Sequence, residues 1–438
     1  MFNTRYSRFK NSRVEWLREI PSHWQIMPLK HALKLVSDKV LTRGSNCRYL
    51  GMENVESQTG AIVDTSVEVE GLANKFQPQD ILFGKLRPYL AKVALVDFWG
   101  LCSTEFLVFR SRFGDPRYFR YLIVSQSFIS LVNSSTYGSK MPRANSDFIC
   151  SQYLPVPDKN EQTSIANFID QQSARIDKAI RVKEQQIVLL KERKQILIQN
   201  AVTRGLKPDA PMRDSGVEWI GGIPAHWSVC RAKYLFREVD ERSERGNEEL
   251  LSVSHVTGVT PRSEKNVTMF MAEDYTGSKT CQKGDLVFNI MWTWMGALGV
   301  SDRAGIVSSS YGVFRQRSPD TFNSQYLEML LKTTGYIEHY NKVSTGLHSS
   351  RLRFYPHMFM AMEIGYPDRE EQDAIVDFIV RECRKLDKAG GLLEQQITKL
   401  KEYKATLINS AVTGKIKVPG VVEPAQGMNE PEAREVCQ

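Results

Sequence analysis

A loose nuclease-like pattern is the first candidate for chemistry in this chain. Pro157-Asp158 is followed by Glu192-Arg193-Lys194, and Pro367-Asp368 is followed by Glu402-Tyr403-Lys404. This order resembles the Pro-Asp…Glu-x-Lys pattern of metal-dependent nucleases. We reject this interpretation, because the Glu and Lys of each copy lie deep within a predicted long helix. Each Asp is better placed to cap the start of that helix.

Other catalytic motifs are absent from the sequence. The chain has no Pro-Pro dipeptide, no G-x-G-x-x-G cofactor loop and no P-loop. Its 7 cysteines form no C-x-x-C pair and its 7 histidines form no H-E-x-x-H pattern, so neither a zinc site nor a disulfide framework is expected. The sequence therefore indicates a protein that is not an enzyme, with no metal and no cofactor in this chain.

Two polar loops carry side chains that could bind a nucleic acid. Residues 136–143 align with residues 344–351, and each loop ends in an arginine. Arg can bind guanine bidentately, whereas Lys or Ser can bind phosphate. The alternative is an ordinary surface loop whose Arg caps a helix or pairs with a carboxylate. We expect at least one of these four side chains to contact DNA: Lys140, Arg143, His348 and Arg351.

A second pair of segments follows a predicted strand in each half. Residues 84–89 are basic, whereas the aligned residues 289–294 are aromatic, so a difference in base preference could lie here. Lys85, Arg87 and Asn289 are therefore further candidates for DNA contact. For Trp292 and Trp294, packing in the core or at a hinge is the favoured alternative.

These candidates belong to an internal repeat. Residues 12–24 resemble residues 215–227, and residues 161–169 resemble residues 371–379. Two copies of one module build a pseudo-twofold object, which suits a target with two half-sites or two copies of a partner. Four tryptophans recur in the opening segments, and we expect them to pack there: Trp16, Trp24, Trp219 and Trp227.

Each repeat predicts a mixed region followed by one long helix. Short apolar runs between Gly, Asp and Ser predict strands at 80–83 and 106–109, with counterparts at 285–288 and 312–314. Helices are expected near 118–132 and 325–340. Asp158 and Asp368 mark the starts of the long helices, and Gly205 and Gly414 mark their ends.

The long helices should pair with each other. Apolar residues recur three or four positions apart from Ile165 to Ala201 and from Ile375 to Ala411. A stripe so long and narrow needs a second long helix to bury it. The sequence therefore predicts an α+β chain with two mixed domains joined by an antiparallel coiled coil.

Length and charge set further bounds. The 438 residues exceed one compact core, and 58 Lys+Arg against 50 Asp+Glu give a formal charge of +8. That surplus favours a polyanionic partner without proving one. No run of 18 apolar residues and no apolar leader occur, so we expect a cytoplasmic protein with no membrane partner.

The repeated motifs resemble the specificity subunit of type I restriction–modification systems. The likeness rests on Val14-Glu15-Trp16 with Ile20-Pro21-x-His23-Trp24, on Glu161-Gln162, on 191–195 and on 201–205, together with the second copies. It covers residues 1–417, nearly the whole chain. It implies target-recognition domains at 1–157 and 207–367, spacer helices at 158–206 and 368–417, and a disordered tail at 418–438.

The resemblance also implies a function and partners. Each recognition domain would read one half of a split sequence in double-stranded DNA. The helices would dock modification subunits, expected to be two, which carry the S-adenosylmethionine site, and restriction subunits would complete the nuclease. The alternatives are a coiled-coil interaction scaffold without sequence-specific DNA binding and, third, a stand-alone methyltransferase.

Overall fold

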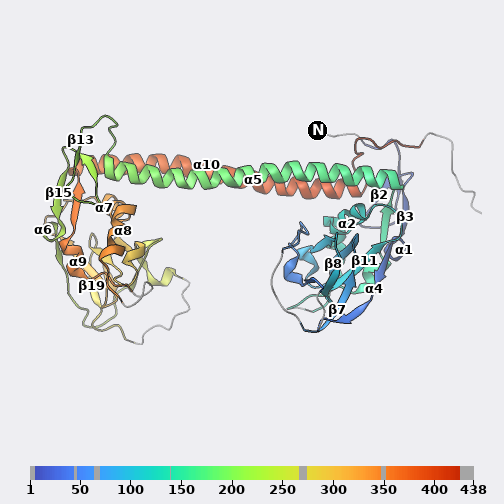
Figure 1. Ribbon diagram of the computed structural model, residues 1–438, viewed down its shortest axis with the longest axis horizontal. Helices are drawn as coiled ribbons and strands as arrows, with labels where there is room; N and C mark the ends of the chain where they lie inside the picture. The colour runs from blue at the N-terminus through green and yellow to red at the C-terminus, as the bar shows by residue number, and fades with distance from the viewer. Residues whose placement is uncertain are drawn as a thin grey trace, which may run out of the picture. The chain divides into compact units, whose positions relative to one another are not determined.

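The computed structural model describes residues 5–43, 47–63, 70–138, 140–265, 274–346 and 352–424. The chain divides into two compact units, which we call module 1 (residues 1–184 and 394–438) and module 2 (residues 185–393). Each module combines a mixed domain with parts of two long helices (Figure 1). The predicted α+β class is confirmed.

Module 1 builds two four-stranded sheets, with strand orders β5-β7-β10-β6 and β4-β11-β8-β9, and two two-stranded sheets, β1-β2 and β12-β3. Its strands are β1 (Phe9–Asn11), β2 (Glu19–Pro21), β3 (Gln25–Pro28), β4 (Leu33–Val36), β5 (Lys39–Leu41), β6 (Tyr49–Leu50), β7 (Leu72–Phe76), β8 (Asp80–Gly84), β9 (Val93–Leu95), β10 (Gly100–Ser103), β11 (Phe106–Ser111) and β12 (Tyr153–Val156). Its short helices are α1 (Leu29–Ala32), η1 (Met52–Asn54), η2 (Pro88–Leu90), α2 (Pro116–Val124), α3 (Gln126–Ser134) and α4 (Ser146–Ser151).

Module 2 keeps the same order with smaller sheets. One four-stranded sheet, β16-β23-β20-β21, is accompanied by the pairs β13-β14, β15-β24, β17-β18 and β19-β22. Its strands are β13 (Met212–Asp214), β14 (Gly222–Pro224), β15 (Ser228–Arg231), β16 (Phe236–Glu238), β17 (Leu251–Ser254), β18 (Gly258–Pro261), β19 (Lys279–Cys281), β20 (Leu286–Phe288), β21 (Leu298–Val300), β22 (Gly305–Val307), β23 (Gly312–Gln316) and β24 (Glu363–Tyr366). Its short helices are α6 (Ala232–Leu235), η3 (Arg262–Glu264), η4 (Thr293–Met295), α7 (Ser324–Leu331), α8 (Thr334–Val343) and α9 (Pro356–Ala361).

The predicted strands form the centre of each mixed domain. β8 pairs antiparallel with β11, and β20 pairs antiparallel with β23. The apolar side chains of these strands are buried, as uninterrupted apolar runs predict. The two stretches expected to be helical each form two helices, because Ser125 and Thr333 adopt extended backbone between them.

The repeated Glu-Gln motif fastens the opening segment of each module to the start of a long helix. In module 1, buried Glu161 accepts hydrogen bonds from Tyr6 Oη (2.7 Å) and His23 Nε2 (2.9 Å). In module 2, Glu371 contacts His226 Nε2 at 2.7 Å. Burial and the Glu161 carboxylate raise the pKa of Tyr6 far above its usual value. The motif is thus structural.

The four recurring tryptophans pack as predicted. Trp24 and Trp227 are 0% and 2% exposed. Trp16 lies edge-on to Phe128, and Trp219 stacks on His339 with ring centroids 3.6 Å apart.

The long helices α5 (Lys159–Arg204) and α10 (Arg369–Val412) begin and end where the sequence predicts. Asp158 Oδ1 accepts the amide of Glu161 at 2.9 Å, and Asp368 Oδ1 accepts the amide of Glu371 at 2.9 Å. These bonds satisfy amides that the first turn of a helix leaves free. Gly205 follows α5 with a positive φ of 75°.

The two helices pair antiparallel within each module. In module 1, Lys404 Nζ lies 2.7 Å from Asp177 Oδ2, and in module 2, Lys194 Nζ lies 2.8 Å from Asp387 Oδ1. The partner numbers fall as the α5 numbers rise, which is the mark of an antiparallel pair. Ile176 and Ile397 of the predicted stripe are 7% and 8% exposed. The predicted antiparallel pairing is confirmed in both modules.

Residues 418–424 differ from the expected disordered tail. Val418 is 1% exposed, and Glu423 accepts hydrogen bonds from Ser7 N (2.9 Å) and Lys417 Nζ (2.8 Å). The Pro- and Gly-rich composition suggested disorder, but the buried Val418 and the ion pair hold this stretch against module 1. Residues 425–438 lie outside the described part of the chain. No helix in the described ranges is long and apolar enough to cross a membrane.

Candidate nucleic-acid interface

The two predicted basic segments of module 1 meet in one surface patch, which we call patch 1 (residues 85–89, 137, 138 and 140–143). The amide of Arg87 donates to Pro142 O at 2.7 Å. Tyr137 and Arg143 exchange backbone hydrogen bonds of 3.2 and 3.0 Å, so these two residues lie side by side. Segments 50 residues apart in the sequence are therefore held side by side by main-chain bonds.

Patch 1 presents cations beside exposed apolar groups. Arg87 and Lys140 are exposed, and Lys85 is half-buried. Arg87 adopts a left-handed conformation with φ 49°, which directs the chain into η2. The patch also exposes three side chains that were not predicted to contact DNA: Tyr89, Tyr137 and Met141. Amphipathic side chains beside Arg and Lys are common in surfaces that bind nucleic acid.

Arg143 is already paired within the patch. Its Nε and Nη2 atoms lie 3.2 Å from the two carboxylate oxygens of Glu105, and this hydrogen bonding raises the pKa of Arg143. The side chain remains 39% exposed. The carboxylate fixes the orientation of the guanidinium. This pairing is the ordinary alternative that the sequence left open, and the exposed part of the side chain stays accessible to a ligand.

Module 2 builds the corresponding patch, which we call patch 2 (residues 289–294, 345, 346, 352 and 353). The amide of Phe354 donates to Ile290 O at 2.9 Å, and Thr345 pairs with Arg353 through hydrogen bonds of 3.1 and 2.8 Å. The same two segments of each repeat are therefore brought together. His348 and Arg351 lie outside the described residues.

Asn289 is a buried group of patch 2. It is 5% exposed, its Nδ2 donates to Tyr311 Oη (3.0 Å) and Val253 O (3.3 Å), and its Oδ1 accepts from Met291 N (3.2 Å). The amide thus supports the turn that carries Trp292, which is 47% exposed and stacks against Trp294. Asn289, the candidate from the sequence, is therefore buried, whereas the ring of Trp292 three residues later is exposed.

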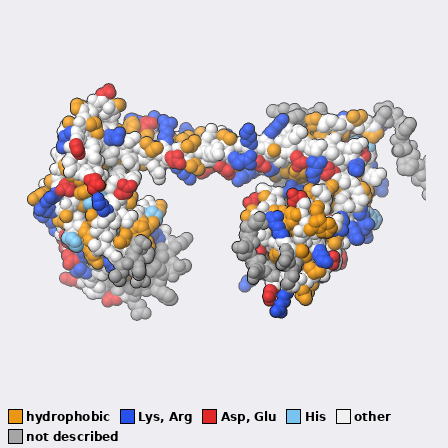
Figure 2. Space-filling view, in the orientation of Figure 1, with side chains coloured by type: hydrophobic (Ala, Val, Ile, Leu, Met, Phe, Trp, Pro, Cys, Tyr) orange, Lys and Arg blue, Asp and Glu red, His pale blue; other side chains and the backbone are white. Residues whose placement is uncertain are grey.

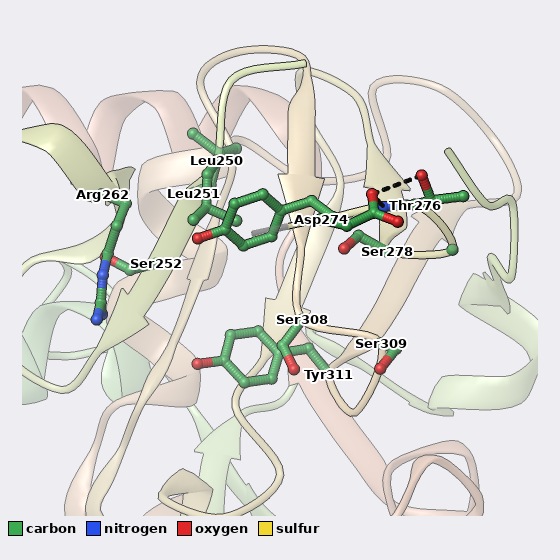
Figure 3. A pocket seen from close by; sticks show the side chains of 12 residues that line it. Leu250, Leu251, Ser252, Arg262, Asp274, Thr276, Ser278, Ser308, Ser309 and Tyr311 are labelled. Carbon is green, nitrogen blue, oxygen red and sulfur yellow. Dashed lines mark hydrogen bonds between the residues drawn. The ribbon is translucent and has the colours of Figure 1, made fainter. Parts of the chain in front are cut away.

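A pocket of about 410 Å³ in module 2 is lined in part by Tyr311, the residue that accepts a hydrogen bond from Asn289 (Figure 3). Hydroxyl groups line much of it, from Ser252, Ser308 and Tyr311, with Arg262 at one side. Burial raises the pKa of Tyr311, and the nearby Arg262 offsets part of that rise. This pocket could not be predicted from the sequence, because its residues come from four separate segments.

The nuclease-like pattern would need a cluster of metal-ligating side chains in the part of the chain that the structure describes. No group of three or more His, Cys, Asp or Glu side chains there could hold a metal ion. Asp158 and Asp368 are helix caps, and Lys194 and Lys404 pair with Asp387 and Asp177. The residues of the nuclease-like pattern therefore have structural partners.

Comparisons with known proteins agree with this architecture. Residues 23–187 match the family described as type I restriction modification DNA specificity domain. The type I restriction enzyme EcoDI specificity subunit of Escherichia coli is 25% identical over 181 residues, which span 40% of this chain and 40% of that protein. The MjaVIII specificity subunit of Methanocaldococcus jannaschii is 23% identical over 326 residues, 70% of this chain and 72% of that protein.

Solved structures share the fold. A chain from a study of complex assembly and conformational transition of the type I R-M system superposes with a TM-score of 0.63 at 17% identity, over 90% of this chain and 98% of that one. The HsdS subunit of Thermoanaerobacter tengcongensis gives a TM-score of 0.53 at 17% identity, over 91% and 98%. The chain is therefore similar to the specificity subunits of type I restriction–modification systems, and its residues 23–187 match the model of their DNA specificity domain.

Proposed function

We propose that this chain is the non-catalytic DNA-recognition subunit of a type I restriction–modification complex. Each module would read one half of a two-part sequence in double-stranded DNA through its patch. The observation that carries the proposal is one arrangement that is repeated in patch 1 and patch 2. In each, a main-chain hydrogen bond joins the segment after a central strand to a later segment, in which two residues also pair through backbone hydrogen bonds. The formal charge of +8 supports a polyanionic target.

The unlike chemistry of the two patches suits two unlike half-sites. Patch 1 carries four cations, Lys85, Arg87, Lys140 and Arg143, whereas the described part of patch 2 exposes one cation, Arg353, beside Trp292. Arg and Lys favour guanine O6 and N7. An aromatic side chain favours apolar contact, for example with a thymine methyl group.

The paired helices offer a surface for partner subunits. Leu189 and Ile196 are each 61% exposed, and they lie seven residues apart along the part of α5 that belongs to module 2. That period places them on one face, away from the buried stripe. Figure 2 shows hydrophobic side chains at the surface of the helices among acidic and basic ones. Exposed apolar rows on a helix mark sites where another helix can pack.

The partners proposed for that face are modification subunits, two per chain, with restriction subunits joining the assembly. S-adenosylmethionine would be bound by the modification subunits. The runner-up function is an interaction scaffold in which the helices act alone and the charge is incidental. Binding to random duplex DNA at several salt concentrations separates the two functions, because phosphate contacts give a salt-dependent affinity.

The sharpest test of the patches is Arg143→Ala in the chain assembled with its modification subunits. Loss of a base-reading arginine should weaken binding by about 1–3 kcal/mol and relax preference in one half-site only. Loss of a phosphate contact should weaken all sequences alike and lower the salt slope by about one. Arg112→Ala, an exposed arginine of module 1 outside patch 1, is the matched control. If Arg143→Ala behaves like the control, patch 1 does not read DNA through this residue.

A further inference from the structure

The opening segments of the two modules fold into the same turn. Ser12 N donates to Arg18 O at 2.7 Å, and Ser215 N donates to Gly221 O at 3.1 Å. In module 1 the amide of Arg13 donates to the side chain of Asn11, two residues earlier. In module 2 the amide of Gly216 donates to the side chain of Asp214 in the same way. Positions 13 and 18 of module 1 therefore correspond to positions 216 and 221 of module 2.

Both positions require a left-handed backbone, but only module 2 uses glycine there. Gly216 and Gly221 have φ of 73° and 68°, whereas Arg13 and Arg18 have φ of 55° and 60°. A side chain makes this conformation unfavourable, and glycine avoids that cost. Module 1 carries arginine twice where the backbone favours glycine, and such outliers gather where a side chain is used.

The two arginines border an open groove of about 1100 Å³ in module 1. Arg5 and Lys415 also line it, and none of these four cations has an ion pair or side-chain hydrogen bond within the described ranges. Phe9, which is 38% exposed, adds an apolar surface. The groove therefore offers four unpaired cations beside an aromatic ring.

The lining favours a protein partner over nucleic acid. Glu15 and Glu19 are exposed carboxylates that also line the groove, so its charge is mixed. A mixed lining suits a protein segment that carries both signs of charge better than a uniformly negative phosphate backbone. Arginine and aromatic side chains mixed with both signs of charge are typical of protein–protein interfaces. The excess of cations selects a partner segment that is acidic.

We propose that this groove binds an acidic protein segment of one docked modification subunit, so that the two copies are held unequally. The inference rests on the proposed function, in which two such subunits dock on one chain. Contacts that both modules can make would bind the two modification subunits with equal affinity. Module 2 has Gly216 and Gly221 in place of the two arginines, so the added contact is made once per chain.

The test is the double variant Arg13→Gly/Arg18→Gly, which gives module 1 the residues of module 2. Glycine fits both backbone positions, so the variant should fold with undiminished thermal stability. Stepwise titration of the full chain with modification subunits, read by calorimetry and native mass spectrometry, measures each binding step. We expect one step to weaken by about tenfold or more and to lose salt dependence, with the other step unchanged.

Lys30→Gln/Lys34→Gln, which removes the same charge from exposed positions of module 1 outside the groove, should leave both steps unchanged. Equal binding by the wild type and the glycine variant in both steps would overturn this inference alone. A variant that binds subunits normally but loses affinity for duplex DNA would also overturn it and make the groove a nucleic-acid surface. Failure of the wild-type chain to bind any modification subunit would overturn the proposed function, and the inference with it.

Discussion

At the residue scale, each module fixes its central sheet with one buried ion pair. Asp80 is 0% exposed and binds Arg110 Nε and Nη2 at 2.7 and 2.8 Å; Asp285 is 1% exposed and binds Arg315 at the same two distances. Each aspartate also accepts a backbone amide three residues earlier, from Gln77 and Gln282. If the carboxylate or one of its donors is removed, the remaining buried polar groups lose their partners, and the folded state is destabilised.

Asp285→Ala should therefore lower the free energy of unfolding of module 2 by about 2–3 kcal/mol, because it removes charged hydrogen bonds and leaves donors without a partner. Urea unfolding of the intact chain measures the loss. Asp302→Ala is the control, because Asp302 pairs with Arg303 while 68% exposed, and it should cost less than about 0.5 kcal/mol. Equal effects of the two substitutions would refute a special role for the buried pair.

Single residues also show where sequence reasoning stops. The polar loops with Lys140 and Arg143 could be found, because Gly-flanked basic segments recur at aligned positions. The burial of Asn289 could not, because it depends on Tyr311 and Val253, which reach the turn only through the folded sheet. DNA contact by all seven candidate residues stays a prediction.

At the element scale, two adjacent leucines of α5 separate folding from docking. Leu190 belongs to the stripe that packs on α10, whereas Leu189 is 61% exposed. Leu190→Asp places a charge in the helix seam and should destabilise the pair by about 2 kcal/mol or more. Leu189→Asp should leave unfolding unchanged but weaken binding of modification subunits.

Thermal unfolding and subunit titration of both variants make the comparison. Normal subunit binding by Leu189→Asp would exclude the exposed face as the docking surface. Unchanged unfolding of Leu190→Asp would show that the seam tolerates a charge and does not hold the helices.

The segment after α10 predicts a pH dependence. Lys417 and Ser7 lower the pKa of Glu423 from 4.5 to about 2. Because the folded-state pKa is depressed, the stabilisation is complete above pH 4.5 and is lost as the pH falls toward 2. Glu423→Gln should lower the melting temperature slightly at pH 7, and its difference from wild type should shrink below pH 4.5. A constant difference from pH 7 to pH 3 would contradict this role of the carboxylate.

The ends of the long helices could be predicted from the sequence, whereas the groove in module 1 could not. The caps at Asp158 and Asp368 and the stops at Gly205 and Gly414 could be assigned because capping is a local property of a few residues. The groove beside Arg13 and Arg18 could not, because the need for a left-handed backbone appears only when the turn is seen.

At the scale of the whole molecule, the proposed function predicts that the length of the paired helices sets the number of base pairs between the two half-sites. Removing residues 184–190 from α5 and residues 391–397 from α10 takes one seven-residue repeat from each helix and keeps their contacts in register. Each helix loses about 10 Å. The half-site sequences should persist while the preferred spacer shortens by about three base pairs. An unchanged spacer in an assembled variant would show that the helices do not set the distance.

The most direct test of the central claim is selection of random duplex DNA by the chain assembled with its modification subunits, followed by sequencing of the bound DNA. Recognition by two modules predicts two short conserved half-sites with a spacer of fixed length, their centres about 10 base pairs apart. Arg143→Ala should alter one half-site and leave the other intact. A single uninterrupted motif, or no enriched sequence at all, would contradict the reading of one half-site by each module.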